Sequence, residues 1–275
     1  MGEEASGGMR EGKAVVRGLF DVLGLAAIRL VTHLGALVLF FVKALVMIFW
    51  PKQLGMVVEH VYYIGARSAM IVMLVGLFTG MVLGLQLYHT LVKIGSTGVV
   101  GSAVALSLVR ELGPVLTAIM ITARAGSAMA AEIGIQRISE QIDALHSMRV
   151  DPVRYLVSPR IAASFISFPL LTALFDLIGI IGGYLSSVVL LGLDPGTYFY
   201  RVQSAVEMED ITAGFVKAAA FAWIVSTVCC FQGYFVHRRR DSYGAKAVGL
   251  STTSAVVISC VLILVADYVV TSLLL

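Results

Sequence analysis

Charged residues are scarce in this chain. Asp, Glu, Lys and Arg together make up 13% of its 275 residues, whereas hydrophobic residues make up 59%. Because soluble domains carry about 25% charged residues, this composition excludes an ordinary soluble protein and indicates an integral membrane protein. The apolar runs are continuous rather than alternating, which excludes a membrane β-barrel and predicts an all-α fold.

The sequence also lacks the motifs of several catalytic classes. No GxxxxGK[ST] phosphate loop occurs, so we expect no ATP hydrolysis by that route. No HExxH motif, paired Cys/His set or Ser/His/Asp grouping appears. The three cysteines, Cys229, Cys230 and Cys260, lie inside apolar runs without metal-ligand spacing and are interpreted as buried small hydrophobes. We therefore predict a protein that is not an enzyme and holds no cofactor or metal of its own.

Five apolar stretches are long enough to cross a membrane, which takes about 20 helical residues. They cover residues 64–91, 99–121, 161–192, 211–236 and 247–274. Residues 1–63 differ in character, and we assign them to a separate N-terminal region.

Within this N-terminal region, residues 14–31 mix Arg17, Asp21 and Arg29 into an apolar pattern, which predicts an interfacial helix. Residues 34–49 are apolar but short. We predict that they lie embedded in the inner leaflet, with a sixth span as the alternative.

Basic residues gather on one side of the predicted spans. They precede the first span, recur through residues 123–160 and form the RRR turn at 238–240. Acidic residues dominate the other side, at Asp194, Glu207, Glu209 and Asp210. Since cytoplasmic loops carry the excess of Lys and Arg, we expect a cytoplasmic N-terminus and, after five spans, a C-terminus outside.

Residues 123–160 form a polar segment far longer than a turn between two spans requires. Arg137 and Glu140 are three residues apart, so they could pair on a helix surface. Asp151-Pro152 is expected to end the helix. The pattern leaves open whether this helix rests on lipid headgroups or docks a soluble partner. The helix is predicted to be amphipathic, because apolar residues recur along one face with the 3.6-residue period of a helix. These residues are Ile138, Ile142, Leu145 and Met148.

Charges interrupt the predicted spans at a few places. Arg110 and Glu111 lie in the second span, just before Pro114, which frees a backbone carbonyl. Adjacent helical residues point about 100° apart, so we expect at least one of the two to reach another helix, a subunit or a headgroup. A structural ion pair within the bundle is equally consistent. Asp176 and Asp267 raise the same question, and we expect Asp267, near the outer end, to meet water.

Glycines repeat at four-residue spacing in the first span, at Gly76, Gly80 and Gly84. Small residues four apart form a flat stripe on a helix, which favours close packing against another helix over a direct ligand role.

Several segments resemble the MlaE family of ABC-transporter permeases. They are GMVLGLQ (80–86), LVRELGPVLTAIMITARAGSAMAAEIG (108–134), EQIDAL (140–145) and MRVDPVRYLVSPR (148–160). The likeness covers residues 64–275 in order, which we interpret as the permease domain. Residues 1–63 resemble the family's interfacial helix region only in character.

The resemblance implies a homodimeric, multi-pass permease of the inner membrane with five spans per copy. Its implied function is to move phospholipid between the inner and outer membranes. A separate cytoplasmic ATPase would bind the ATP, and periplasmic MCE-domain proteins would carry the lipid. We expect no nucleic-acid partner.

The resemblance also suggests which residues act. A coupling helix within residues 123–150 would fit a groove of the ATPase, with four candidate contact or positioning residues, Glu132, Arg137, Glu140 and Asp143. The lipid cavity would lie at the dimer interface, lined by the first, second and fifth spans. Its candidates are Leu83, Leu87, Arg110 and Glu111, with Lys217 near the outer mouth.

Three alternatives stay open at this point. The cargo could be another lipid or a sterol. An ion-driven secondary transporter would use the carboxylates of Glu111, Asp176 and Asp267. A non-transporting membrane scaffold would hold no lipid between its subunits.

Overall fold

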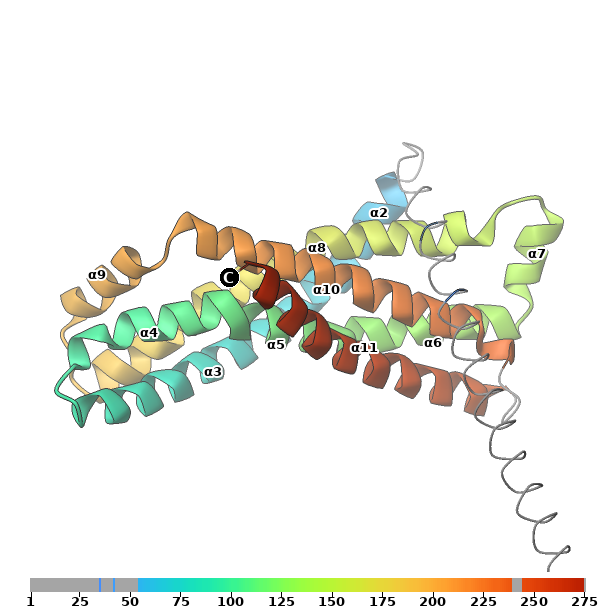
Figure 1. Cartoon of the computed structure of the whole chain (residues 1–275). Helices are drawn as coiled ribbons and strands as arrows, with labels where there is room; N and C mark the ends of the chain where they lie inside the picture. Colours follow the sequence, from blue (N-terminus) through green and yellow to red (C-terminus); the bar gives the residue numbers. More distant parts are fainter. Residues whose placement is uncertain (1–34, 36–41, 43–53, 239–243, 275) are drawn as a thin grey trace, which may run out of the picture. The chain divides into compact units, whose positions relative to one another are not determined.

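The computed structural model describes residues 54–238 and 244–274, together with Gly35 and Val42. The chain divides into two units, 1–43 and 44–275, and the helices of Figure 1 that carry labels belong to the second. The interfacial helix predicted at 14–31, the embedded helix at 34–49, and Arg239 and Arg240 lie outside the described residues. Within the described ranges all regular structure is helical, which confirms the all-α prediction.

Five of the helical stretches are long and apolar enough to cross a membrane, so the prediction of five spans is confirmed (Figure 1). They run over Leu54–Val92, Thr97–Ile138, Val153–Leu190, Met208–Tyr234 and Ala245–Leu273. The chain is therefore a multi-pass membrane protein.

The long stretches are built from consecutive segments, some of them short π or 3-10 turns, labelled η. The first comprises α2 (Leu54–Val61), η3 (Tyr62–Ala66) and α3 (Arg67–Val92). The second comprises η4 (Thr97–Val99), α4 (Val100–Ser107), η5 (Leu108–Leu112), α5 (Gly113–Ile121), η6 (Thr122–Gly126) and α6 (Ser127–Ile138). The third comprises η7 (Val153–Val157), α8 (Ser158–Tyr184) and η8 (Leu185–Leu190), and the last two are α10 (Met208–Tyr234) and α11 (Ala245–Leu274). Three short elements lie between them, α7 (Gln141–Ser147), α9 (Pro195–Ala205) and η9 (Val236–Arg238).

The helices extend beyond the predicted spans. The first begins at Leu54 rather than at residue 64, and the second continues to Ile138 rather than ending near 121. An apolar run marks only the part of a helix that can lie in hydrocarbon. Backbone hydrogen bonds continue through the polar residues that follow, so hydropathy underestimates helix length.

The glycine stripe of α3 packs directly against α8. A Cβ atom on Gly76 would lie 2.9 Å from the carbonyl oxygen of Phe175, and one on Gly80 would overlap the backbone of Gly179. The two backbones therefore approach as closely as small residues allow. This confirms that the stripe serves helix packing.

The α9 helix lies at the end of the bundle opposite α7 (Figure 1). Asp194 begins it as an N-cap, accepting a hydrogen bond from the backbone N–H of Thr197 at 2.7 Å. That bond holds the pKa of the Asp194 carboxyl below its usual range. Tyr198 is fully buried, and its hydroxyl donates to the carbonyl of Ile180 at 3.0 Å, which fastens α9 to α8.

We expect Gly80→Ala to destabilise the fold, because its methyl group has no space against Gly179. Overpacking costs about 1–3 kcal/mol, which corresponds to a fall of roughly 3–10 °C in the apparent melting temperature of the purified protein. Gly134→Ala is the matched control, since its Cβ would meet only ordinary contacts with Val248 at 3.5 Å. Equal melting temperatures for the two variants would contradict the packing role.

Candidate functional site

The two charges of the second span turn toward different neighbours. Arg110 Nε donates to Asp210 Oδ1 at 2.6 Å. Glu111 Oε2 accepts from Lys217 Nζ, also at 2.6 Å. Both residues reach α10, which confirms that at least one would find another helix. Their i, i+1 spacing separates the two pairs around the helix.

Lys217 is the most enclosed member of this cluster, with its side chain 3% exposed. Its ammonium lies 3.2 Å from Asp267 Oδ1 on α11 as an ion pair, without the alignment of a hydrogen bond. It also donates to the backbone carbonyl of Arg110 at 2.9 Å. In a regular helix that carbonyl would accept from residue 114, but Pro114 has no N–H. Lys217 is therefore a side-chain donor to a carbonyl that residue 114 cannot reach.

The expectation that Asp267 meets water is wrong. Its side chain is 22% exposed and ion-paired with Lys217, because α11 brings it against α10. One helical turn further along α11, Thr271 donates to Glu111 at 3.4 Å. The cluster therefore joins α10 and α11 to the η5–α5 region and sets three carboxylates against two cations. Charges in a low-dielectric bundle persist only when they are paired in this way.

Beside this cluster, α3 carries a hollow of about 320 Å³. Leu83 lines it, together with Phe78, Thr79, Val82 and Leu112, which follows Glu111 in the chain. Phe78 is 56% exposed, so the hollow opens on the outside of the bundle. Leu87 lies one turn further along α3 and packs partly buried against the core.

The connection between the second and third spans bends sharply, and we call residues 132–151 the elbow. It is not the single helix that the apolar stripe from Ile138 to Met148 predicts. The α6 helix ends at Ile138, and α7 begins only at Gln141. Between them Glu140 adopts a left-handed conformation, with φ of 59°, as residues just past a helix end often do. Ile142 is fully buried whereas Met148 is 72% exposed, so the predicted stripe does not share one face.

Arg137 closes the elbow by pairing with Asp143, not with Glu140. Its Nη1 donates to Asp143 Oδ1 at 2.8 Å, and its Nε donates to His237 at 3.0 Å. The guanidinium also lies over the ring of Tyr234. The break at residues 139–140 removes the i, i+3 geometry on which the Arg137–Glu140 prediction depended. Arg137 thereby ties the elbow to the end of α10.

Glu132 and Asp151 hold the elbow to the third span. The carboxylate of Glu132 pairs with Arg160 at 3.1 Å, and Arg160 is almost fully buried and also donates to the carbonyl of Leu156. Asp151 accepts from the backbone N–H of Val153 at 3.0 Å. Asp151-Pro152 therefore begins the third span instead of ending the loop helix, because proline is well suited to a first helical turn.

Comparison with known proteins identifies the family. Residues 57–273 match the family model described as Permease MlaE. The chain belongs to the MlaE permease family. The match includes the charged cluster, the hollow at Leu83 and the elbow, and it confirms the resemblance seen in the sequence.

Relatives of this MlaE-family chain come from distant organisms. A probable ABC transporter permease protein of Rickettsia bellii is 38% identical over 252 residues, which cover 91% of this chain and 95% of the relative. The intermembrane phospholipid transport system permease protein MlaE of Haemophilus influenzae is 40% identical over 224 residues, 81% of this chain and 84% of the relative. The chloroplastic protein TRIGALACTOSYLDIACYLGLYCEROL 1 of Arabidopsis thaliana is 36% identical over 208 residues, 76% of this chain and 58% of the relative.

The residues suggested from the sequence fall into two groups in this MlaE-family fold. One group lies in or beside the charged cluster and the other at the elbow, and their roles stay predictions. Sequence reasoning missed Asp210, Thr271 and Arg160 as partners. Thr271 stands four residues after Asp267, a helical spacing that could have suggested a shared face. The clusters of His, Cys, Asp and Glu in the described ranges include none that could hold a metal ion.

We expect Lys217→Met to destabilise the protein strongly, because Glu111 and Asp267 would then face each other without a cation. Removing one partner of a buried pair costs about 3–5 kcal/mol, and the half-exposed Glu111 places this case near the lower figure. Combining Lys217→Met with Glu111→Gln and Asp267→Asn removes the repulsion and should recover most of the loss. Thermal unfolding of the purified variants measures both effects. A triple variant no more stable than Lys217→Met would contradict this assignment.

Proposed function

We propose that this chain is the permease subunit of an ABC transporter that moves phospholipid between the inner and outer membranes. The observation that carries the proposal is an ion-paired charge cluster beside an apolar hollow, both within helices that span the membrane. A phospholipid has the matching combination of a charged headgroup and apolar chains. Family membership supports the same function, and so does the phospholipid transport system to which the Haemophilus relative belongs.

Two of the three ion pairs of the cluster have one enclosed and one open partner. The side chains of Lys217 and Asp210 are 3% and 9% exposed, whereas those of Glu111 and Arg110 are 45% and 51% exposed. The enclosed partners hold the open ones in place. The open face of the Arg110 guanidinium is suited to a phosphate oxygen.

The uncovered faces of α3 and α11 support a homodimer. Only 11% of the most apolar part of α11 is buried, against 67% for α10. On α3 the exposed apolar residues follow a four-residue repeat, on the face away from the glycine stripe, at Met70, Leu74, Phe78 and Val82. A second copy packed on this surface would enclose the hollows of both subunits as one lipid cavity.

The elbow is the proposed docking point for a separate cytoplasmic ATPase. Glu140 is exposed at the helix break, and the Asp143 side chain is 56% exposed. Arg137 connects this elbow to the end of α10, and α10 carries Lys217. A rigid movement of the elbow would therefore reach the charged cluster and open or narrow the cavity.

This arrangement implies an orientation in the inner membrane. The elbow and the N-terminus would face the cytoplasm and the ATPase, and the C-terminus would face the periplasm. A periplasmic MCE-domain protein would exchange lipid with the outer mouth. A sterol or another lipid would fit the same combination of groups.

The paired carboxylates favour ATP-driven transport over an ion-driven mechanism. Of the three carboxylates that an ion-driven mechanism would use, Glu111 and Asp267 are both bound by Lys217, which leaves Asp176 as the one not engaged in an ion pair of the cluster. Copurification distinguishes the two mechanisms, because the ATP-driven one requires a stoichiometric ATPase subunit.

We expect Glu140→Lys and Asp143→Lys to uncouple ATP hydrolysis from lipid movement. In proteoliposomes that contain the complete complex, lipid transfer should fall by roughly 5- to 150-fold, the range of typical coupling free energies, while ATP hydrolysis continues. Glu59→Lys is the matched control, an equal charge reversal at an exposed position on α2. Glu140 makes no side-chain bond to another described residue, so its variant separates docking from elbow stability. Normal coupling in both elbow variants would count against the docking role.

A further inference from the structure

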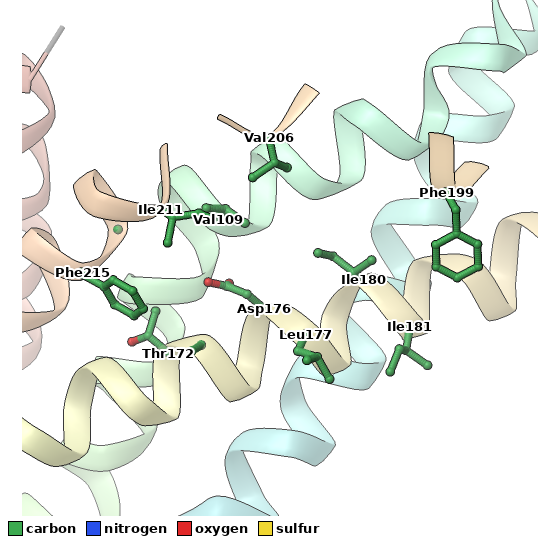
Figure 2. A pocket seen from close by; sticks show the side chains of 12 residues that line it. Val109, Thr172, Asp176, Leu177, Ile180, Ile181, Phe199, Val206, Ile211 and Phe215 are labelled. Atoms are coloured by element: carbon green, nitrogen blue, oxygen red, sulfur yellow. The ribbon is translucent and has the colours of Figure 1, made fainter. Parts of the chain in front are cut away.

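A second, larger cavity lies on another side of the bundle, between α8, the α9–α10 connection and the first turns of α10 (Figure 2). Its volume is about 380 Å³, and it shares no lining residue with the hollow at Leu83. Leu177, Ile180, Phe199 and Phe215 give it mostly apolar walls. Asp176 is the only charged side chain among its lining residues, and Figure 2 shows the carboxylate pointing into the space.

Asp176 has no partner among the described residues. Its Oδ1 is shielded from solvent and accepts no hydrogen bond. The nearby hydroxyl of Thr172 already donates to the carbonyl of Phe168 at 2.9 Å. Gly113 leaves the room for this carboxylate, since a Cβ atom there would overlap it. A carboxylate in such apolar surroundings is costly unless a cation or donor reaches it.

Acidic residues lie close to the cavity in the chain. Val206 and Ile211 line the cavity, and Glu207 and Glu209 between them in the chain are exposed. No Lys or Arg lines the space. Asp176 is the one charge in the lining, and its unpaired carboxylate favours a positively charged group.

The cavity is open at the outside of the bundle, beside the third span. Leu177 is 58% exposed and Phe199 is 52% exposed, so both wall residues face the surroundings of the helices. A molecule dissolved in the membrane can enter from that side. A bare divalent cation does not fit, because Mg²⁺ and Ca²⁺ take six or more oxygen ligands and the lining offers one carboxylate.

We propose that this cavity binds an amine-bearing lipid, with a hydrocarbon chain against the apolar walls and the ammonium group paired with Asp176. The volume is near the lower end of the ≈ 300–1,000 Å³ range for ligand sites, so one chain and the head region enter rather than a whole diacyl lipid. The site is independent of the transport cavity, and its occupancy requires neither an ATPase nor a second copy of the chain.

Tryptophan quenching by brominated lipids tests the site directly. The full chain with Phe215→Trp, Trp50→Phe and Trp223→Phe has a single tryptophan, in the cavity wall. It is reconstituted with phosphatidylethanolamine or phosphatidylglycerol that carry the same brominated chains. We expect half-maximal quenching at a roughly tenfold lower mole fraction of phosphatidylethanolamine, as expected for one charge-assisted hydrogen bond.

Two further variants identify the group responsible. Asp176→Asn should abolish the difference between the two lipids. Asp194→Asn should retain it, because Asp194 lies outside the lining and asparagine caps a helix equally well. Equal quenching by both lipids in the starting protein would overturn the proposal even if Asp176→Asn fails to fold. A preference that survives Asp176→Asn would overturn it too.

Discussion

The structure depends on one ammonium group inside the membrane. Lys217 binds the carboxylates of Glu111 and Asp267 and the backbone carbonyl of Arg110, to which Pro114 has no N–H to donate. Burying any one of these groups without a partner in an apolar bundle would cost free energy of folding. Together they fix α10 and α11 against the second span and hold Glu111 where half of its side chain stays open. The glycine stripe of α3 supplies the matching close contact on the other side of the bundle, against α8.

Features that depend on local composition could be predicted from the sequence. Continuous apolar runs predict the five helices, because hydrocarbon excludes other backbone structures. The glycine repeat of α3 predicts close packing, because its three residues share one helix face. The ion-pair partner of each charged residue could not be predicted. Asp267 and Lys217, for example, are fifty residues apart in sequence, and only the packing of α11 on α10 brings them together. The prediction of one continuous helix at the elbow was wrong for another reason. Periodicity assumes an uninterrupted helix, and the left-handed conformation of Glu140 interrupts it.

The proposed transport mechanism follows from how the two regions are connected. Arg137 joins the elbow to the end of α10, and Lys217 on α10 joins that helix to the charged cluster. The same helix also forms a wall of the cavity at Asp176, on a different side of the bundle. In the proposed mechanism, a movement of α10 would act on the charged cluster through Lys217.

The central claim is that phospholipid passes beside the charged cluster, at the hollow of Leu83. A photoreactive amino acid in place of Leu83, in the complete complex with labelled phospholipid, tests it most directly. The same substitution at Leu170, a 64% exposed position on α8, reports ordinary membrane contact. The account predicts a lipid adduct at Leu83 that changes when ATP is added, and an adduct at Leu170 that does not. Labelling at Leu83 that equals labelling at Leu170, and that does not respond to ATP, would contradict it.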